Sequence, residues 1–246
     1  MMNFSFDFAG RTALVTGGVS GIGAATSLAF RAAGARVIAC GLTDEELDGA
    51  RANPRFGGIE VVRLDVRDGD AVQKVVGALD SLDFVVNSAG LIHRMAEHDP
   101  AKFAEVIDVN LNGGMRVCAA ARPLLARSRG AIVFIASVMS FFGGPMQPAY
   151  SASKGAVRNL TMSLGAAYAE DGIRVNAVAP GWVITNLSKG ARENPARNAQ
   201  IMSRIPMARW ADPADIADPI LFLCSDAARY MTGTVMPVDG GYTSVG

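Results

Sequence analysis

Short runs of consecutive apolar residues alternate along the chain with longer segments in which apolar residues recur every three or four positions. The runs predict buried strands, and the longer segments have the spacing of helices that bury one face. The predicted strands are 12–16, 36–40, 59–65, 82–90, 131–137, 173–180 and 233–239. The predicted helices include 22–34, 43–50, 69–79, about 101–126, a helix that contains 150–156, and 213–226.

Strands that alternate with helices predict βαβ units and therefore a parallel sheet. Right-handed crossovers place the helices on both faces, so the expected fold is α/β, a Rossmann-like doubly wound parallel sheet. No internal repeat, low-complexity segment or Pro/Gly/Ser linker divides the sequence, so one domain is expected over 1–246. The Pro-containing segment at about 183–208 is predicted to be a loop-rich insertion.

Composition narrows the possible partners. Lys plus Arg and Asp plus Glu both number 23, so the formal net charge is zero, and half of the 246 residues are hydrophobic. No basic run or basic half is present, which argues against nucleic acid as a partner. The chain is expected to form a packed core rather than to be disordered.

The three cysteines are far apart in the sequence and lie among apolar residues. No CxxC or Cys/His spacing indicates a metal site, so we expect small buried core residues in a reducing compartment. The first residues lack the basic and apolar regions of a signal peptide, and the apolar runs are too short to span a bilayer. A soluble cytoplasmic protein without membrane contact is therefore expected.

A glycine-rich turn, TGGVSGIG, follows the first predicted strand and opens the first helix. Its residues Gly17, Gly21 and Gly23 lie where the pyrophosphate of a dinucleotide contacts helix amides and the positive end of the helix dipole. A mononucleotide P-loop is excluded because no G-K-[ST] follows the glycines. The turn predicts nucleotide binding at the carboxyl edge of the sheet, where open α/β sheets bind ligands.

The stretch YSASKGA places Tyr150 and Lys154 one helical turn apart on the same face. Two amphipathic side chains on a half-buried helix are one interpretation of this pair. The other is that the ammonium makes the phenol more acidic, so that Tyr150 can transfer a proton near neutral pH. The pair alone does not decide between them.

Six motifs, in order along nearly the whole chain, resemble those of the short-chain dehydrogenase/reductase family. TGGVSGIG is similar to its TGxxxGxG signature, and NSAG at 87–90 is similar to its NNAG motif, with Ser88 in place of the second Asn. Asn110, Ser137, Tyr150 and Lys154 match its Asn-Ser-Tyr-Lys tetrad, and the segments PGWVIT (180–185) and VDGG (238–241) match as well. The resemblance implies an NAD(P)-dependent oxidoreductase that acts on CH–OH groups.

The resemblance implies a role for each member of the tetrad. Tyr150 would be the general acid in reduction and the general base in oxidation. Lys154 would lower the pKa of Tyr150 and hold the ribose of the nicotinamide. Ser137 would stabilise charge on the substrate oxygen, and Asn110 would hold a water that connects Lys154 to solvent.

The implied cofactor contacts follow the ends of successive strands. They are Gly17, Ser20, Gly21, Ile22, Gly23, Gly41, Leu42, Asp65, Val66, Asn87, Ala89, Gly90, Tyr150, Lys154, Pro180, Gly181, Val183 and Thr185. NAD-specific members carry an acidic residue after the second strand, and NADP-using members carry a cation there or in the glycine loop. This chain has Gly41 and Leu42 after the strand and no Arg in the glycine loop, so NAD is favoured over NADP.

Within the family, the segments NSAGLIHR, IASVMSFFGG, SRIPMARW and VDGGYT resemble the sugar-acid and polyol branch, the 2-dehydro-3-deoxy-D-gluconate 5-dehydrogenase type. Arg94 could grip a carboxylate, and His93 could hydrogen-bond a substrate oxygen; a solvated arginine and a structural histidine are the alternatives. The expected substrate contacts are His93, Arg94, Ser137, Met139, Gln147, Tyr150 and Trp182. Phe141 is also expected at the mouth of the pocket, and segment 183–208 is expected to cover the substrate.

Two other functions remain open on the sequence. A 3-oxoacyl-carrier-protein reductase would need a basic patch for its acidic carrier. A non-catalytic nucleotide sensor would be expected to lack the tyrosine or the lysine of the tetrad. The resemblance also implies a homotetramer that takes a small-molecule substrate and needs no metal.

Overall fold

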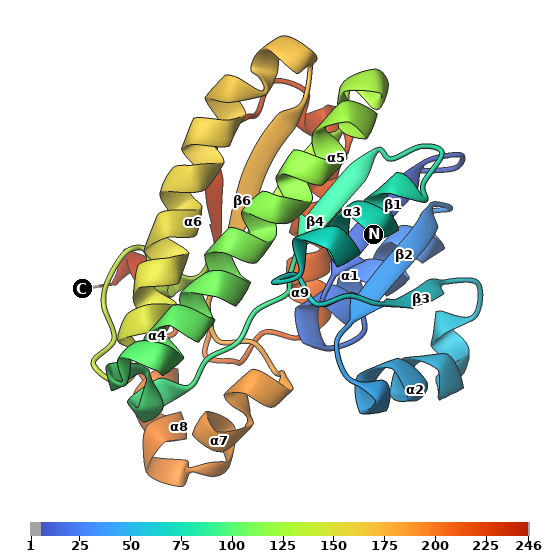
Figure 1. Ribbon diagram of the computed structural model, residues 1–246. Coiled ribbons are helices and arrows are strands. Elements are labelled where there is room, and N and C mark those ends of the chain that lie inside the picture. The colour runs from blue at the N-terminus through green and yellow to red at the C-terminus, as the bar shows by residue number, and fades with distance from the viewer. Residues whose placement is uncertain (1–5, 246) are drawn as a thin grey trace, which may run out of the picture.

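The computed structural model describes residues 6–245, which contain a single seven-stranded sheet with every strand parallel to its neighbours. The strand order is β3-β2-β1-β4-β5-β6-β7 (Figure 1). The order reverses between β1 and β4, which confirms the doubly wound α/β fold expected from the sequence. The strands are β1 (Thr12–Thr16), β2 (Arg36–Gly41), β3 (Glu60–Arg63), β4 (Phe84–Asn87), β5 (Ala131–Ile135), β6 (Arg174–Pro180) and β7 (Val235–Val238).

Helices cover both faces of the sheet. On one face lie α3 (Gly69–Gly77), α5 (Gly114–Ser128) and α6 (Pro148–Ala167), and on the other lie α1 (Gly21–Ala32) and α9 (Pro213–Cys224) (Figure 1). The short helix α2 (Asp44–Ala52) flanks the β3 edge. It begins with the expected capping box, in which Thr43 and Glu46 bond each other's backbone amides.

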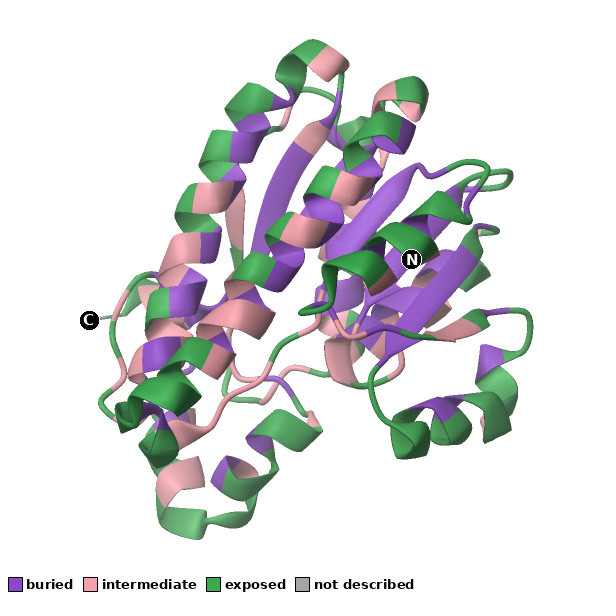
Figure 2. Ribbon diagram, in the orientation of Figure 1, coloured by how far each residue is buried: buried purple, intermediate pink, exposed green. Residues whose placement is uncertain are grey.

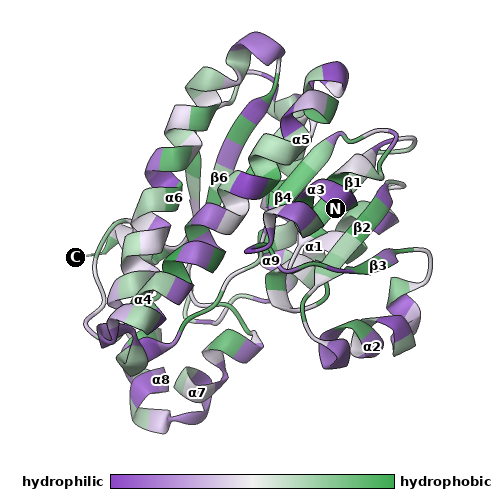
Figure 3. Cartoon of the chain, viewed as in Figure 1, coloured by the Kyte–Doolittle hydropathy of each residue, from purple (hydrophilic) through white to green (hydrophobic). Residues whose placement is uncertain are grey.

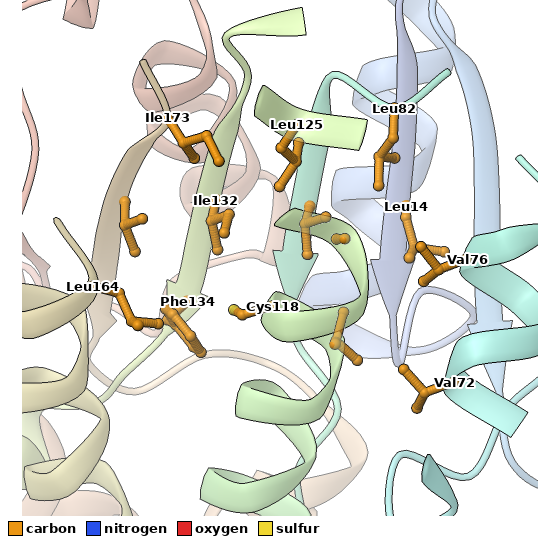
Figure 4. Close-up of a cluster of buried hydrophobic side chains, with 14 of the residues drawn as sticks. Leu14, Val72, Val76, Leu82, Cys118, Leu125, Ile132, Phe134, Leu164 and Ile173 are labelled. Atoms are coloured by element: carbon orange, nitrogen blue, oxygen red, sulfur yellow. The ribbon is translucent and has the colours of Figure 1, made fainter. Parts of the chain in front are cut away.

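Alternation along the strands divides the core into two layers. Leu14 packs with the helices of one face, whereas Ala13 and Val15 pack with those of the other. The five inner strands are largely buried and mainly apolar, the edge strands β3 and β7 are partly exposed, and the outer faces of the helices are exposed (Figures 2 and 3). Figure 4 shows the first layer, in which Ile132 and Phe134 of β5 lie among residues from α5 and α6. A packed core of this kind fixes the strand ends that carry the site.

The long helix expected at 101–126 is present but irregular. It consists of α4 (Pro100–Ile107), a π-helical segment at Asp108–Gly113, and α5. The π segment contains Asn110, whose side chain is directed into the protein and is 5% exposed. A π turn is rare and occurs mostly at functional sites, because it changes the direction of the side chains that follow.

The segment 183–208 is more regular than the loop-rich insertion expected from the sequence. It contains α7 (Lys189–Glu193) and α8 (Pro195–Met202). Asn194 precedes α8 and accepts a hydrogen bond from the backbone amide of Arg197 at 3.0 Å, which explains why a short polar stretch is helical. Ala191, Ile201 and nearby residues form a small apolar cluster of their own beneath these helices.

The cysteines and the helices of residues 6–245 bear on two further expectations from the sequence. Cys40, Cys118 and Cys224 are unpaired and buried, and burial raises the pKa of each thiol to about 12, as expected for core residues. Within that range, no helix has the length and apolarity that crossing a membrane requires.

Candidate active site

Two adjoining cavities open at the carboxyl edge of the sheet. The larger, which we name the glycine-loop cleft, has a volume of about 1390 Å³ including its open mouth and runs along the ends of β1, β2, β3 and β4. The smaller, which we name the tyrosine cavity, has a volume of about 750 Å³ and lies over the ends of β5 and β6. Tyr150 of α6 lies in the wall between them and lines both.

The turn between β1 and α1 provides an open helix N-terminus for an anionic group. Gly17 has a φ of +61° and Gly21 a φ of +50°, values that favour glycine. A Cβ on Gly17 would come within 3.0 Å of Ala89, so a side chain would close the cleft at this point. Ser20 precedes α1 without capping it through its side chain, which leaves the first amides of the helix for a ligand. These features fit a dinucleotide pyrophosphate.

Most of the expected cofactor contacts lie around the two cavities. The cleft is lined by Gly17, Ser20, Gly21, Ile22, Gly41, Leu42, Asp65, Val66, Ala89, Gly90, Tyr150, Lys154 and Thr185. Pro180, Gly181 and Val183 instead line the tyrosine cavity, beside the wall that the two cavities share.

Gly23 and Asn87 line neither cavity. A Cβ on Gly23 would lie 2.1 Å from the carbonyl oxygen of Gly17, so Gly23 permits close packing of the helix on the turn rather than contacting a ligand. The Asn87 side chain donates to Cys118 Sγ at 3.4 Å, and its Oδ1 is buried without a partner. The direction of these two residues could not be inferred from the motif spacing.

Gly41 ends β2 without a side chain, and the guanidinium of Arg63 beside it donates to the carbonyl oxygen of Leu42 at 3.3 Å and pairs with Asp44. A Cβ on Gly41 would come within 2.5 Å of Val19 Cγ2, so a residue of the glycine loop excludes any side chain here. The nearby carboxylate belongs to Glu46 of α2, which lines the cleft and accepts from the backbone amides of Leu42 at 3.1 Å and Thr43 at 3.2 Å. The sequence showed the capping box but not that it lies at the cleft.

Lys154 is a buried cation, 6% exposed, at the floor of the cleft. Its Nζ donates to the carbonyl oxygen of Ile135 at 2.6 Å and lies 5.5 Å from the centre of the Tyr150 ring. Loss of hydration lowers the pKa of Lys154 to about 8. The amine is therefore placed both to hold a ligand in the cleft and to influence the tyrosine.

The pKa of Tyr150 is raised, which differs from the lowering expected from the Tyr-Lys pair. Burial of the phenol is the main cause and the charge of Glu97 adds to it, whereas a hydrogen bond with Ser137 and the charge of Arg94 act in the opposite direction. The ammonium of Lys154 donates to the carbonyl oxygen of Ile135 and lies over the face of the Tyr150 ring.

Ser137 and Asn110 are fixed by hydrogen bonds. Ser137 follows β5, is 7% exposed and accepts from the backbone amide of Met139 at 3.1 Å while lining the tyrosine cavity. The Asn110 amide bonds both backbone groups of Leu91, at 2.8 and 3.0 Å, and donates to Ser153 at 3.1 Å. Its side chain therefore ties the loop after β4 to α6, and its expected role in holding a water remains a prediction.

Glu97 is a functional candidate that the motifs did not indicate. It is only 1% exposed and accepts hydrogen bonds from the backbone amides of His93 at 2.9 Å and Tyr150 at 2.8 Å. One buried carboxylate thus joins the loop after β4 to the first turn of the helix that carries the tyrosine. In the sequence it resembled an ordinary surface glutamate.

Most of the expected substrate contacts converge on the tyrosine cavity. Arg94, Ser137, Met139, Gln147, Tyr150 and Trp182 all line it. His93 does not, because its ring hydrogen-bonds Glu105 at 3.1 Å, away from the cavity. Phe141 is also outside, 42% exposed, with the guanidinium of Arg158 5.4 Å from its ring centre. Arg197 of α8 lines the cavity although it was not among the expected contacts.

Residues 6–245 contain no group of three or more His, Cys, Asp or Glu side chains placed to hold a metal ion. The phenol of Tyr150, the hydroxyl of Ser137 and the amine of Lys154 line the two cavities. A phenol and a hydroxyl in the wall of the same cavity can bind one substrate oxygen and exchange a proton with it.

Comparisons with known proteins agree with this arrangement. The family model described as enoyl-(acyl-carrier-protein) reductase matches residues 17–243. The chain is 38% identical to 2-dehydro-3-deoxy-D-gluconate 5-dehydrogenase of Pseudoalteromonas atlantica, covering 96% of this chain and 97% of that protein. It is 40% identical to galactitol 2-dehydrogenase (L-tagatose-forming) of Cereibacter sphaeroides, covering 97% of both. It is 39% identical to 3-oxoacyl-[acyl-carrier-protein] reductase of Thermotoga maritima, covering 94% of this chain and 97% of that protein.

A solved structure from Beutenbergia cavernae, described as an NAD(P)-dependent gluconate 5-dehydrogenase with NADP bound at low occupancy, is 40% identical with a TM-score of 0.89. The alignment covers 98% of this chain and 99% of that one. The resemblance first indicated by six short motifs thus extends over the full length of sequence and fold. The chain belongs to the short-chain dehydrogenase/reductase family, whose enzymes transfer hydride between NAD(P) and CH–OH groups.

Proposed function

We propose that the protein interconverts a secondary alcohol and a ketone on a sugar acid or polyol, with Tyr150 as the acid/base. One observation carries the proposal: Tyr150 and Ser137 line the same cavity, and this cavity adjoins the cleft that Lys154 lines. The resemblance to sugar-acid and polyol dehydrogenases supports the substrate class.

When bound in the glycine-loop cleft, the nicotinamide cofactor supplies or accepts the hydride. The substrate oxygen lies between the hydroxyls of Ser137 and Tyr150, which orient it for reaction. In oxidation, Tyr150 as phenolate takes the hydroxyl proton; in reduction, its phenol returns that proton to the oxygen. Ser137 stabilises the charge that develops on the oxygen during either reaction. Lys154 holds the ribose beside the tyrosine and provides positive charge near the phenolate.

NAD is the favoured cofactor in this proposal. The additional phosphate of NADP is carried by the adenosine ribose, which would be bound near the end of the second strand. There the Glu46 carboxylate already occupies the amides of Leu42 and Thr43, and its charge would repel a phosphate. A ribose hydroxyl could instead donate to that carboxylate, as a hydroxyl does to the acidic residue of NAD-specific proteins.

We also propose a homotetramer in a reducing compartment such as the cytoplasm. Phe103 of α4, Met115 of α5 and Met162 of α6 are large apolar side chains that are 37%, 36% and 51% exposed. These helices form the exposed outer layer on one face, which could pack against another copy. The three unpaired cysteines suit a reducing environment.

The decisive experiment is an assay at the nicotinamide absorbance, with NAD and NADP side by side, over sugar acids, polyols, simple secondary alcohols and a 3-oxoacyl thioester. Turnover of sugar acids or polyols, with loss of about 10²–10⁴-fold in Tyr150→Phe and retained cofactor binding, supports the proposal. Near-normal activity of Tyr150→Phe would contradict the proton transfer. Turnover confined to the thioester would favour the acyl-carrier-protein reductase function of the Thermotoga relative.

A further inference from the structure

Arg197 is a cation that faces the tyrosine cavity without an anionic partner. It lies in the first turn of α8 and lines the cavity together with Tyr150 and Gln147. Its Nε is buried and has no hydrogen-bond partner, and its Nη1 lies 3.4 Å from the thioether sulfur of Met146. A thioether is a weak acceptor, so the guanidinium, which has five N–H donors, is left poorly satisfied.

The surroundings of Arg197 reinforce the positive charge. The described residues that line the cavity include no Asp or Glu, and they include a second guanidinium, that of Arg94. Arg94 has only one contact of note, from its Nη2 to the carbonyl oxygen of Leu187 at 3.0 Å. Elsewhere the walls are largely apolar, with Ile92, Val138 and Trp182 among them. Charges in such a partly dry cavity interact more strongly than they would in water.

The position of Arg197 is fixed by its own element. Asn194 caps α8 through the backbone amide of Arg197, and Asn198 accepts a hydrogen bond from the Trp210 indole at 2.7 Å. Met146, which the guanidinium contacts, comes just before Gln147 and four residues before Tyr150. The cation is therefore held beside the first turn of the catalytic helix rather than extended into solvent.

We propose that Arg197 binds the carboxylate of an acidic substrate, at the end of the molecule away from the carbon that reacts. This inference rests on the proposed function and narrows it: the substrates are sugar acids, and neutral polyols are the weaker group. The guanidinium suits this role because its planar fork matches a carboxylate and because its donors are available. Arg94, in the loop after β4, adds positive charge to the cavity, but its Nη2 already donates to the carbonyl oxygen of Leu187.

The test uses a matched pair of ligands, D-gluconate and D-glucitol, which differ by a carboxylate in place of a hydroxymethyl group. Their dissociation constants are measured by calorimetry on the full chain loaded with cofactor, in a Tyr150→Phe background that prevents turnover. Arg197→Met removes the charge, and Arg197→Lys keeps the charge without the fork. Lys189→Met, on the neighbouring α7, removes an exposed cation outside both cavities and serves as the control.

Arg197→Met is expected to weaken gluconate binding about 10- to 100-fold, the range of a charge-assisted hydrogen bond, and to change glucitol binding less than about twofold. Arg197→Lys should fall between, and Lys189→Met should match the parent. An equal loss for both ligands, or no loss for either, overturns the inference.

The same measurements separate this inference from the proposed function. If the wild-type enzyme oxidises gluconate but the dissociation constant of gluconate does not change on substitution of Arg197, the inference fails and the proposed function stands. If no panel substrate is turned over but gluconate binding still depends on Arg197, the anion site stands and the proposed reaction fails. If Tyr150→Phe binds glucitol more tightly than gluconate, the inference is overturned whatever the turnover.

Discussion

At the scale of single residues, the site contains a buried cation, Lys154, although burial disfavours the charged form of its amine. Lys154 is almost fully buried, and its pKa falls to about 8 because the ammonium has lost its hydration. One bond, to the Ile135 carbonyl, offsets only part of that loss. Residues retained for chemistry commonly reduce stability in this way.

Lys154→Met should therefore abolish activity and stabilise the cofactor-free protein. The fall in pKa from 10.5 to about 8 means that burying the charge lowers the free energy of unfolding by about 3 kcal/mol. The substitution also loses a hydrogen bond that stabilises the protein by about 1 kcal/mol. The free energy of unfolding should therefore rise by about 2 kcal/mol at pH 7. The check is denaturant unfolding with and without the substitution. Lys102→Met, an exposed lysine on α4, is the control and should change stability little.

The pH dependence of this difference has a definite sign. Below pH 8 the lysine is charged in both the folded and unfolded states, so wild type carries the full penalty. Between pH 8 and 10.5 the unfolded state binds more protons, so the stability of wild type rises and the gap to the variant closes. If the difference in the free energy of unfolding between wild type and Lys154→Met were constant with pH, burial of the charge would not be its cause.

Glu97 affects the tyrosine through both charge and position. Its negative charge raises the pKa of Tyr150, so Glu97→Gln should move the pH profile of alcohol oxidation toward lower pH. Arg94 and Lys154, the other charges near the phenol, remain in place in this variant. A glutamine can accept from only one of the two amides, so kcat should fall as well.

The measurement is the pH dependence of kcat and kcat/KM, with Glu170→Gln as the control. Glu170 is exposed and lies just beyond the opposite end of α6, so its charge should not reach the phenol. A purely structural role for Glu97 would lower kcat without moving the profile, and that result would contradict the electrostatic part of this prediction.

At the scale of elements, α2 connects helix capping with cofactor choice. Glu46→Gln keeps the side-chain oxygen that caps the helix but removes a negative charge from the lining of the glycine-loop cleft. We expect kcat/KM for NADP to rise about tenfold or more while that for NAD falls, because the repulsion of the additional phosphate is removed. Steady-state kinetics with both cofactors test this.

Glu45→Gln, one residue earlier on the same helix, is the matched control for Glu46→Gln. Glu45 takes no part in the capping box and does not line the glycine-loop cleft. An unchanged NAD-to-NADP ratio in Glu46→Gln would remove Glu46 as the determinant, and an equal shift in both variants would indicate a general effect of net charge.

The elements themselves were largely predictable, because each strand is a short apolar run and each helix has a clear period. The π segment was not, since residues 108–113 are compatible with an ordinary α-helix and nothing in their order requires the wider turn. Helix α8 was missed because its signal is a single Asn cap before a proline, within a polar stretch.

Site residues were predictable where a backbone motif fixes their direction and not where tertiary packing does. Tyr150 and Ser137 line the same cavity, and the roles that the motif implies for them remain predictions. His93 and Arg94 are adjacent, yet only Arg94 lines the cavity, because Arg94 adopts a φ of +46° and His93 is drawn to Glu105. The sequence alone contains no signal for that local geometry.

At the scale of the whole molecule, the outer surface of α4, α5 and α6 around Phe103, Met115 and Met162 should be covered in solution. Light scattering should give a mass four times that of the 25.7 kDa chain. Met162→Asp places a charge on the exposed surface of α6 and should reduce that mass, because burying an unpaired charge at an interface is costly.

Ala52→Asp, at the exposed end of α2 by the opposite edge of the sheet, should leave the mass of the assembly unchanged. A monomeric wild type would contradict the tetramer directly. An unaltered assembly in Met162→Asp would show that this surface of α6 lies outside the contact.

Five residues line both cavities: Ile22, Ile135, Tyr150, Thr185 and Leu187. The two cavities therefore share part of their walls, and a nucleotide in the glycine-loop cleft would form one side of the tyrosine cavity. Thr185 and Leu187 belong to the segment 183–208, which also carries Arg197. A nucleotide that contacts them in the cleft would therefore also position the wall that the substrate contacts. We therefore expect a compulsory order of binding, in which the nucleotide binds first and leaves last. Product inhibition should accordingly be competitive only between the two forms of the nucleotide.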